Sequence, residues 1–315
     1  MIAFGPVPSR RLGRSLGVNN IPPKICSYSC IYCQLGRTSQ VRIDRRSFYR
    51  PAEILRAVRE QVEAARCLEE PIDYLTFVPD GEPTLDVHLG QAIDLLKSLD
   101  IKIAVITNAS LIWRRKVREA LMKADWVSLK VDAVSEKIWR CINRPHGSLR
   151  LCSILDGMGT FATSFSGELA TETMLIDGLN DGEHYIRELA QFLQQLRPSI
   201  AYLAIPTRPP AEKYARPPHE SQINRAYQLF SEQIERVELL VGYEGNAFAF
   251  TGHAEQDLLS ITSVHPMRAE AVAELLAKAG ETWDMVRRMI AEGKLIEMEH
   301  EGHTFYMRKL ASLSD

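Results

Sequence analysis

Long apolar runs are absent from this chain of 315 residues, and cysteine is scarce. No stretch reaches the roughly 18 to 20 consecutive apolar residues that a membrane helix needs, and residues 1–10 lack the charged start and apolar core of a secretory signal. The six cysteines are too few for a disulfide framework in a chain of this length. We therefore expect a cytoplasmic protein with no membrane partner.

The composition is that of a globular protein. About 45% of the residues are apolar and 25% are charged, which allows a large core and excludes disordered, collagen-like and coiled-coil chains. The net charge of −2 is unevenly distributed, because residues 1–50 carry nine Lys or Arg and one acid, whereas residues 253–315 carry seven and eleven. The basic amino-terminal segment favours an anionic partner.

Short β-branched runs alternate with amphipathic stretches over most of residues 1–252, which is the pattern of successive βα units. Six such units predict an α/β domain that forms a partial (β/α)6 TIM-like barrel. The expected strands are 16–19, 73–78, 102–107, 126–131, 169–176 and 201–205. The expected helices are 52–65, 87–99, 114–122, 135–141, 183–196 and 220–234.

A different pattern follows in residues 253–315. Helical periodicity at 255–259, 269–279 and 282–292, followed by two short strands around Glu301-Gly302, predicts a small winged-helix-like domain. Such domains commonly bind nucleic acid, but an excess of four acidic residues opposes contact with a phosphate backbone. A role in docking a substrate or partner is the preferred interpretation.

Three of the cysteines, Cys26, Cys30 and Cys33, have the spacing C-x3-C-x2-C on an expected loop. Buried structural cysteines on one helical face could share this spacing. A structural zinc site needs four ligands, and the other cysteines are remote from these three. Three thiolates can instead hold three corners of a four-iron cubane and leave the fourth iron open. The spacing therefore favours an iron-sulfur cluster.

The cysteine motif, with Tyr32 before its last cysteine, resembles the C-x3-C-x-aromatic-C signature of the radical S-adenosylmethionine (SAM) superfamily. The resemblance implies an enzyme with one 4Fe-4S cluster held by these cysteines, SAM as second cofactor, and an electron donor such as flavodoxin or ferredoxin. In that family, one electron from the cluster cleaves SAM to a 5′-deoxyadenosyl radical, which abstracts hydrogen from a substrate.

Further candidate residues stand at the carboxyl ends of the expected strands, where the active sites of barrel enzymes lie. The segment 80–84 resembles the family's G-G-E-P element, although Asp80 replaces its first glycine. The resemblance and strand alternation together suggest a set of SAM-binding residues. They are Tyr32, Gly81, Glu82, Asn108, Ser128, Lys130, Asp132, Glu172, Met174 and Ile205. An internal ion pair between Lys130 and Asp132, and helix capping near Asn108, are the structural alternatives.

The substrate class stays open between RNA and protein. Segments 5–13, 142–145 and 207–210 resemble the branch of iron-sulfur oxidoreductases near the tRNA wyosine synthases, but residues 1–25 lack the cysteines with which archaeal members hold a second cluster. This resemblance and the basic segment slightly favour RNA. A protein- or peptide-modifying enzyme, including a glycyl-radical activase, is the alternative, and a non-catalytic electron-transfer protein is a third.

Overall fold

The computed structural model describes residues 1–78, 80–240, 253–264, 266–300 and 302–309. Its centre is a curved eight-stranded sheet in the order β1-β2-β5-β6-β7-β8-β9-β10. All neighbours from β2 to β10 are parallel, and β1 pairs antiparallel with β2. The strands are β1 (Ala3–Ser9), β2 (Gly13–Val18), β5 (Tyr74–Phe77), β6 (Lys102–Thr107), β7 (Trp126–Lys130), β8 (Glu168–Met174), β9 (Ile200–Ala204) and β10 (Val237–Leu240).

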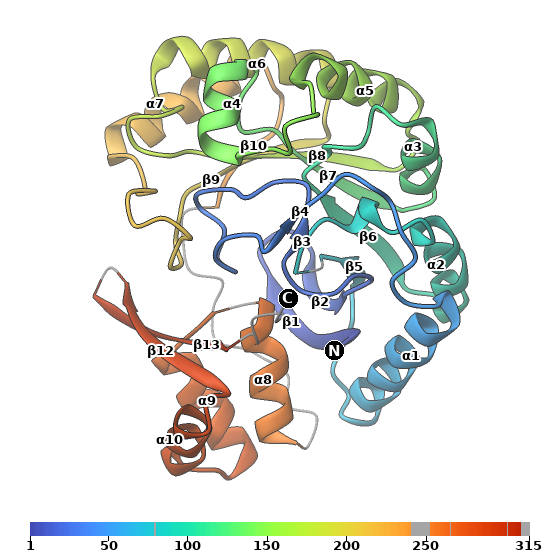
Figure 1. Cartoon of the computed structure of the whole chain (residues 1–315), viewed down its shortest axis with the longest axis vertical. Coiled ribbons are helices and arrows are strands. Elements are labelled where there is room, and N and C mark those ends of the chain that lie inside the picture. The colour runs from blue at the N-terminus through green and yellow to red at the C-terminus, as the bar shows by residue number, and fades with distance from the viewer. Residues whose placement is uncertain (79, 241–252, 265, 301, 310–315) are drawn as a thin grey trace.

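Seven helices cover the outer face of this sheet, which bends into a half-barrel (Figure 1). They are α1 (Pro51–Cys67), α2 (Leu89–Leu96), α3 (Arg115–Leu121), α4 (Glu136–Asn143), α5 (Leu151–Ser164), α6 (Glu183–Leu196) and α7 (Glu220–Ser231). Short 3-10 helices, η1 (Pro83–Leu85) and η2 (Lys97–Leu99), follow β5 and α2. Among the described residues, every helix is too short or too polar to cross a bilayer.

The half-barrel contains all six expected strands and six expected helices, but it is larger than a six-strand barrel. The sequence pattern did not predict β1, β10 or α5. Strand β1 contains two prolines, which a sheet accepts at its edge where no ladder donor is needed. Strand β10 has only four residues, and α5 contains two glycines that weaken its helical signal. The expected six-strand count is therefore corrected to eight strands, seven of them parallel.

Side-chain size on the inner face sets where the barrel interior stays open. Trp126, the first residue of β7, and Tyr202 of β9 are buried in an inner cluster with alanines of β6 and β8. The outer face carries branched side chains such as Leu75 and Val105, which pack with the helices in the main core. Because bulky rings fill the interior near the start of β7, space remains toward the carboxyl ends of the strands.

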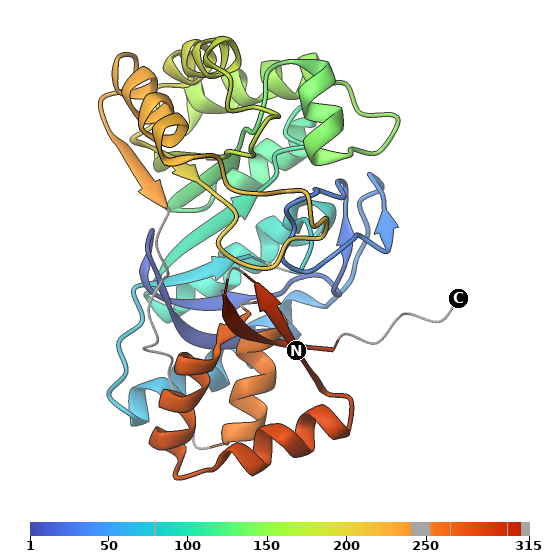
Figure 2. The ribbon, with the colours of Figure 1, turned by 90° about the vertical axis from the view of Figure 1, so that its left-hand side faces the viewer.

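The last described segments form a separate small core beside the half-barrel. It contains α8 (Ala254–Val264), α9 (Ala269–Ala279), α10 (Trp283–Ala291) and a sheet in the order β11 (Met267–Arg268), β13 (His303–Arg308), β12 (Leu295–His300). Helix α8 packs against β1, and Val7 of β1 joins this second core (Figure 2). The expected domain boundary after residue 252 lies at the end of 241–252, outside the described residues.

Candidate functional site

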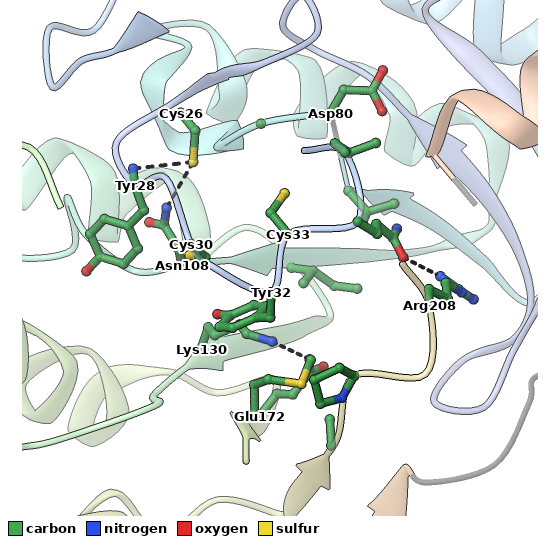
Figure 3. Close-up of a pocket in the computed structure, with 18 of the residues that line it drawn as sticks. Cys26, Tyr28, Cys30, Tyr32, Cys33, Asp80, Asn108, Lys130, Glu172 and Arg208 are labelled. Atoms are coloured by element: carbon green, nitrogen blue, oxygen red, sulfur yellow. Dashed lines mark hydrogen bonds and ion pairs between the residues drawn. The ribbon is translucent and has the colours of Figure 1, made fainter. Parts of the chain in front are cut away.

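A cavity of about 310 Å³ opens at the carboxyl ends of the parallel strands (Figure 3). Eleven of the thirteen residues expected from the sequence line it. They are Cys26, Cys30, Tyr32, Cys33, Gly81, Glu82, Asn108, Lys130, Glu172, Met174 and Ile205. The other two, Ser128 and Asp132, are buried outside the cavity lining. Residues that are up to 179 positions apart in the chain thus share one site.

Cys26 ends β3 (Ile25–Cys26), and Cys30 and Cys33 lie between it and β4 (Gln40–Val41); these two short strands pair in parallel. This segment, residues 24–40, is called the cysteine loop. Its backbone is tied to the end of α4, because Ile31 N donates to the carbonyl of Ile142 at 2.9 Å. A turn closes where Gly36, with a φ of +81°, donates to the Cys33 carbonyl at 3.0 Å. The loop therefore holds its thiols on a fixed frame.

Gly81 lets the cysteine loop approach the end of β5. A Cβ atom at this position would overlap the carbonyl oxygen of Ile25. The same carbonyl accepts a hydrogen bond of 3.1 Å from the backbone nitrogen of Glu82. Glycine is required here because two backbones meet, so the residue shapes the site without offering a side chain.

The three thiols are partly exposed, yet the surrounding protein desolvates them. Burial raises the pKa of Cys26 and Cys33, and it raises the pKa of Cys30 to about 12, with the nearby Asp132 charge adding to the effect. Without a positive partner these groups hold their protons. Lys130 and Lys24 oppose the rise at Cys33. The set of three desolvated thiols therefore fits an iron cluster, whose charge would stabilise the thiolates.

Two asparagine amides point their N–H groups at these sulfurs. Asn108 Nδ2 lies 3.4 Å from Cys26 Sγ, and Asn143 Nδ2 lies 3.5 Å from Cys30 Sγ. The backbone nitrogen of Tyr28 adds a third contact, 3.5 Å from Cys26 Sγ. Such N–H to sulfur contacts stabilise electron-rich sulfur and are one way in which a protein adjusts a cluster's potential.

Glu82 is bound tightly to its own protein. Its Oε1 accepts hydrogen bonds from the backbone and hydroxyl of Thr84 at 3.0 and 2.6 Å and from the Thr107 hydroxyl at 2.6 Å. Its Oε2 accepts from Asn108 N at 2.8 Å. Burial raises its pKa, and these donors oppose that rise. Since Oε2 can accept one more hydrogen bond, Glu82 can position Asn108 and still receive a ligand donor.

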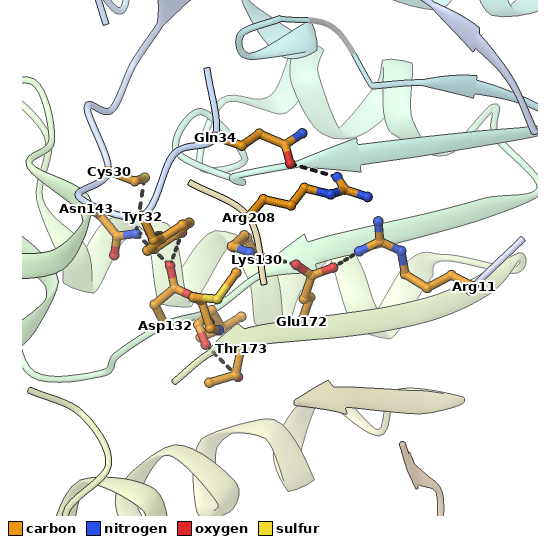
Figure 4. A network of polar contacts seen from close by, with 12 residues as sticks. Arg11, Cys30, Tyr32, Gln34, Lys130, Asp132, Asn143, Glu172, Thr173 and Arg208 are labelled. Atoms are coloured by element: carbon orange, nitrogen blue, oxygen red, sulfur yellow. Dashed lines mark hydrogen bonds and ion pairs between the residues drawn. The ribbon is translucent and has the colours of Figure 1, made fainter. Parts of the chain in front are cut away.

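Strand alternation placed Asp132 on the inner face with Lys130, but its carboxylate lies beside Tyr32 and Asn143 instead (Figure 4). Its carboxylate accepts from the Tyr32 hydroxyl, from Asn143 Nδ2 at 2.6 Å and from Met174 N at 2.8 Å. It lies past the end of β7, so strand alternation no longer governs its direction. Ser128 shares the inner face with Lys130 but sits two residues deeper in the strand. Asp132 therefore contacts the cysteine loop through Tyr32 and does not line the cavity.

Lys130 pairs with Glu172, not with Asp132. Its Nζ lies 2.7 Å from Glu172 Oε1, and the other carboxylate oxygen pairs with Arg11. The ammonium also lies 4.9 Å from the centroid of the Tyr32 ring. Desolvation lowers the pKa of Lys130, and neighbouring negative groups oppose this shift. Two cations share one carboxylate, so this part of the cavity carries a net positive charge that suits an anionic ligand group.

The structure adds residues that were not among the expected cofactor contacts. Arg10, Arg11, Lys24 and Arg208 line the same cavity. Arg10, Arg11 and Arg208 belong to two of the three family-like segments, 5–13 and 207–210, so basic residues inside those segments were the available signal.

Asp80 also lines the cavity and is the residue that departs from the G-G-E-P pattern. Its side chain is buried, and its Oδ1 has no hydrogen-bond partner among the described residues. Burial raises its pKa to about 7. Its backbone is held on both sides, by Asn19 Oδ1 at 3.2 Å and by Lys24 N at 2.7 Å.

Comparison with known proteins agrees with this geometry. The sequence model of the radical SAM superfamily matches residues 20–193, which contain the cysteine loop and four of the parallel strand ends. The chain belongs to the radical SAM superfamily. It is therefore a radical SAM enzyme, and membership implies a 4Fe-4S cluster and SAM as cofactors.

Relatives extend the match to nearly the whole chain. The UPF0026 protein MJ1312 of Methanocaldococcus jannaschii is 50% identical over 313 residues, which cover 99% of this chain and 97% of the relative. A UPF0026 protein of Helicobacter pylori strain J99 is 32% identical and covers 87% and 88% of the two chains. This radical SAM protein is thus also a member of the UPF0026 family.

Solved structures share the fold at low identity. TYW1 with a lysine-pyruvate adduct bound matches with a TM-score of 0.55 and 17% identity, covering 71% of this chain and 76% of that one. A radical SAM methyltransferase from Sphaerobacter thermophilus matches with a TM-score of 0.56 and 17% identity, covering 72% and 66%. At this identity the likeness shows the partial barrel and no more.

Replacing Asn143 by Ala should lower the reduction potential of the cluster. The variant loses the N–H contact to Cys30, which favours the electron-rich reduced state, and each 1 kcal/mol of lost stabilisation corresponds to about 40 mV. Redox titration of the anaerobic holoenzyme, followed by electron paramagnetic resonance, measures the shift. Asn224→Ala, at an exposed position of α7, is the control. An unchanged potential in fully loaded Asn143→Ala protein would contradict the assignment.

Replacing Asp80 by Asn should stabilise the protein increasingly as pH rises. The folded-state pKa of about 7 lies above the ordinary value of 3.8, so folded Asp80 keeps a proton that the unfolded chain has released. The parent therefore loses stability between these values, by up to roughly 1.4 kcal/mol per pH unit, and the variant does not. Urea unfolding between pH 5.5 and 7.5 measures the gap. A gap that stays constant over this range would show that Asp80 is not desolvated.

Proposed function

We propose that Cys26, Cys30 and Cys33 hold one 4Fe-4S cluster, that SAM binds beside it in the cavity, and that the substrate is RNA. The supporting observation is that the three cysteines and eight further expected residues line a single cavity. When bound, the cluster and SAM supply an electron and a 5′-deoxyadenosyl radical for hydrogen abstraction. The chain's own residues bind, orient and shield these groups.

The polar residues of the cavity match the parts of SAM. The remaining acceptor capacity of Glu82 suits the methionine ammonium. The net positive group of Lys130, Arg11 and Glu172 suits the carboxylate. Met174 and Ile205 offer apolar wall next to these charges, where the ribose and adenine would lie. Asp132 and Asn143 act through Tyr32 and Cys30, as positioning residues.

Anaerobic reconstitution should give about four irons and four sulfides per chain, and the reduced protein should release 5′-deoxyadenosine from SAM. Changing Cys26, Cys30 or Cys33 to Ala should abolish both, because each thiolate holds one corner of the cluster. The matched controls are Cys67→Ala, Cys141→Ala and Cys152→Ala, since these cysteines are exposed. Iron and sulfide analysis and chromatography of the nucleoside measure the outcome. Full iron content in any of the three loop variants would overturn the cluster assignment.

The choice of RNA rests on charge near the site, together with the resemblance to the wyosine synthase branch. The structure shows that part of the basic amino-terminal segment is used internally. Arg14 pairs with Glu70, and Arg45 donates to the carbonyls of Thr84 and Asp86 at 2.8 Å each. Exposed or partly exposed cations of the segment, such as Arg42, Arg46 and Arg50, form none of the ion pairs observed in the described residues and suit contact with phosphates.

A protein substrate is the second candidate, because the carboxy-terminal unit is acidic and packs against β1. Its three helices and antiparallel sheet support the winged-helix-like reading, and such a unit can dock a polypeptide. In both cases the electron donor would be a small protein such as flavodoxin or ferredoxin. The two substrates differ in their response to salt.

If the substrate is RNA, its affinity should fall steeply between roughly 50 and 200 mM salt, with a log-log slope of several units. Changing both Arg42 and Arg46 to Glu should weaken binding further, and these residues avoid the structural role of Arg45. Fluorescence anisotropy with cellular RNA and the anaerobic full-length protein measures both effects. A salt-insensitive interaction with a polypeptide, and no measurable binding of RNA, would favour the protein-modifying alternative.

A further inference from the structure

The loop that follows β9 lies against the cysteine loop and fixes a surface next to the cavity (Figure 2). The backbone nitrogen of Glu212 donates to the carbonyl of Ile31 at 2.9 Å. Arg208 Nη1 donates to Gln34 Oε1 at 2.7 Å, and both residues line the cavity. These contacts join two segments that both border the proposed SAM site. Any surface that this loop presents is therefore held close to the cavity.

One buried carboxylate orients two arginines on this surface. The Glu212 carboxylate accepts hydrogen bonds from Arg37 Nε at 2.9 Å, from Arg37 Nη2 at 3.1 Å and from Arg144 Nη1 at 2.5 Å. The Glu212 side chain is 10% exposed, whereas that of Arg37 is 73% exposed. The buried carboxylate of Glu212 thus fixes the guanidinium of Arg37, and most of the Arg37 side chain faces solvent. An arginine fixed in this way is preorganised to bind an anion.

An exposed aromatic ring stands beside these arginines. Tyr214 is 53% exposed, and its hydroxyl accepts a hydrogen bond of 2.7 Å from Arg144 Nη2. Its backbone takes part in a tight turn, since Arg216 N donates to the Tyr214 carbonyl at 2.9 Å. The ring is therefore fixed at its hydroxyl end and at its backbone, and much of it is open to solvent. Folding gains little from burying this side chain.

Further cations lie near Tyr214 along the loop. Lys213 and Arg216 are exposed on the same loop. Together with Arg37 and Arg144 they give four positive charges against the one negative charge of Glu212. An aromatic ring among cations is typical of sites for single-stranded nucleic acid, where bases stack on the ring and cations contact the backbone.

We propose that this tyrosine platform, formed by Arg37, Arg144, Lys213, Tyr214 and Arg216, binds a single-stranded segment of RNA. An unpaired base stacks on Tyr214, and the cations contact the adjacent phosphates. Because Gly36 and Arg208, on the same two loops, line the cavity, a neighbouring nucleotide reaches the SAM site. The inference rests on RNA as the proposed substrate, and it names the surface that recognises it.

The stacking contact is tested with a labelled RNA hairpin that has a loop of about eight unpaired nucleotides. Tyr214→Ala should weaken binding by the full-length, cluster-loaded protein roughly five- to a hundredfold, because one base loses its stacking partner. Tyr214→Phe keeps the ring and loses only the hydroxyl, so it should bind within about twofold of the parent. Fluorescence anisotropy measures the affinities, and iron content shows that the cysteine loop remains folded. Equal affinities for the parent and the Ala variant would overturn the stacking role.

The phosphate contacts are tested with Lys213→Glu and Arg216→Glu combined. None of the side-chain hydrogen bonds and ion pairs observed in the described residues involves Lys213 or Arg216, so the change alters charge without breaking the loop's own contacts. It should weaken hairpin binding and reduce the salt slope by about 1.4 units, which corresponds to two single-strand phosphate contacts. The matched control is Arg56→Glu with Arg59→Glu, an equal charge change on exposed positions of α1.

Two results would overturn the platform, and a third would overturn the function on which it rests. If the control pair weakens binding as much as the loop pair, the effect is one of overall charge. If the loop pair binds like the parent, the surface is not used while RNA binding itself stands. If the parent protein fails to bind any RNA and binds a polypeptide instead, the proposed substrate is wrong. In that case the variants have no RNA affinity to lose.

Discussion

The desolvation of three thiols at one place is the constraint on which the site depends. Neutral thiols tolerate this environment, but thiolates do not unless a positive centre lies beside them, so the loop favours a metal cluster over free reactive cysteines. Asn108 and Asn143 reach Cys26 and Cys30 from the ends of two different elements. The cysteine loop is thus oriented by the barrel as well as by its own turns.

The carboxylates around the cavity divide into two kinds. Asp132 accepts hydrogen bonds from Tyr32, Asn143 and the backbone of Met174, so it connects the cysteine loop to β8. Glu172 is shared between two cations, which leaves that region positive and able to attract an anion. Asp132 follows the end of β7 and Glu172 lies on the neighbouring β8, so the two carboxylates differ mainly in their hydrogen-bond partners.

In the large sheet, the sequence was sufficient for six of the seven parallel strands among the described residues, because strands buried on both faces are largely apolar runs. It was insufficient for β1, whose prolines are allowed only because the strand is at an edge, and for β10, which has only four residues. In the site, strand ends located the cavity-lining residues that belong to strands or follow them directly. Alternation failed for Asp132, because the strand had already ended, and it could not show that Lys130 pairs across to Glu172 instead. Such pairings depend on register between strands, which no local pattern contains.

The distribution of basic residues in the sequence does not show which of them are free to contact a partner in the structure. The excess of positive charge in residues 1–50 suggests a long basic surface, but Arg11, Arg14 and Arg45 are bound to acceptors inside the protein. Arg37 is bound as well, yet its carboxylate partner is buried below it, so the pair exposes the cation and hides the anion. Recognition near the cavity therefore depends less on the number of basic residues than on which of them are held with an open face. The loop after β9 supplies both the buried carboxylate and the exposed tyrosine, so under the proposed RNA recognition a segment with little regular structure would orient the groups that meet the substrate.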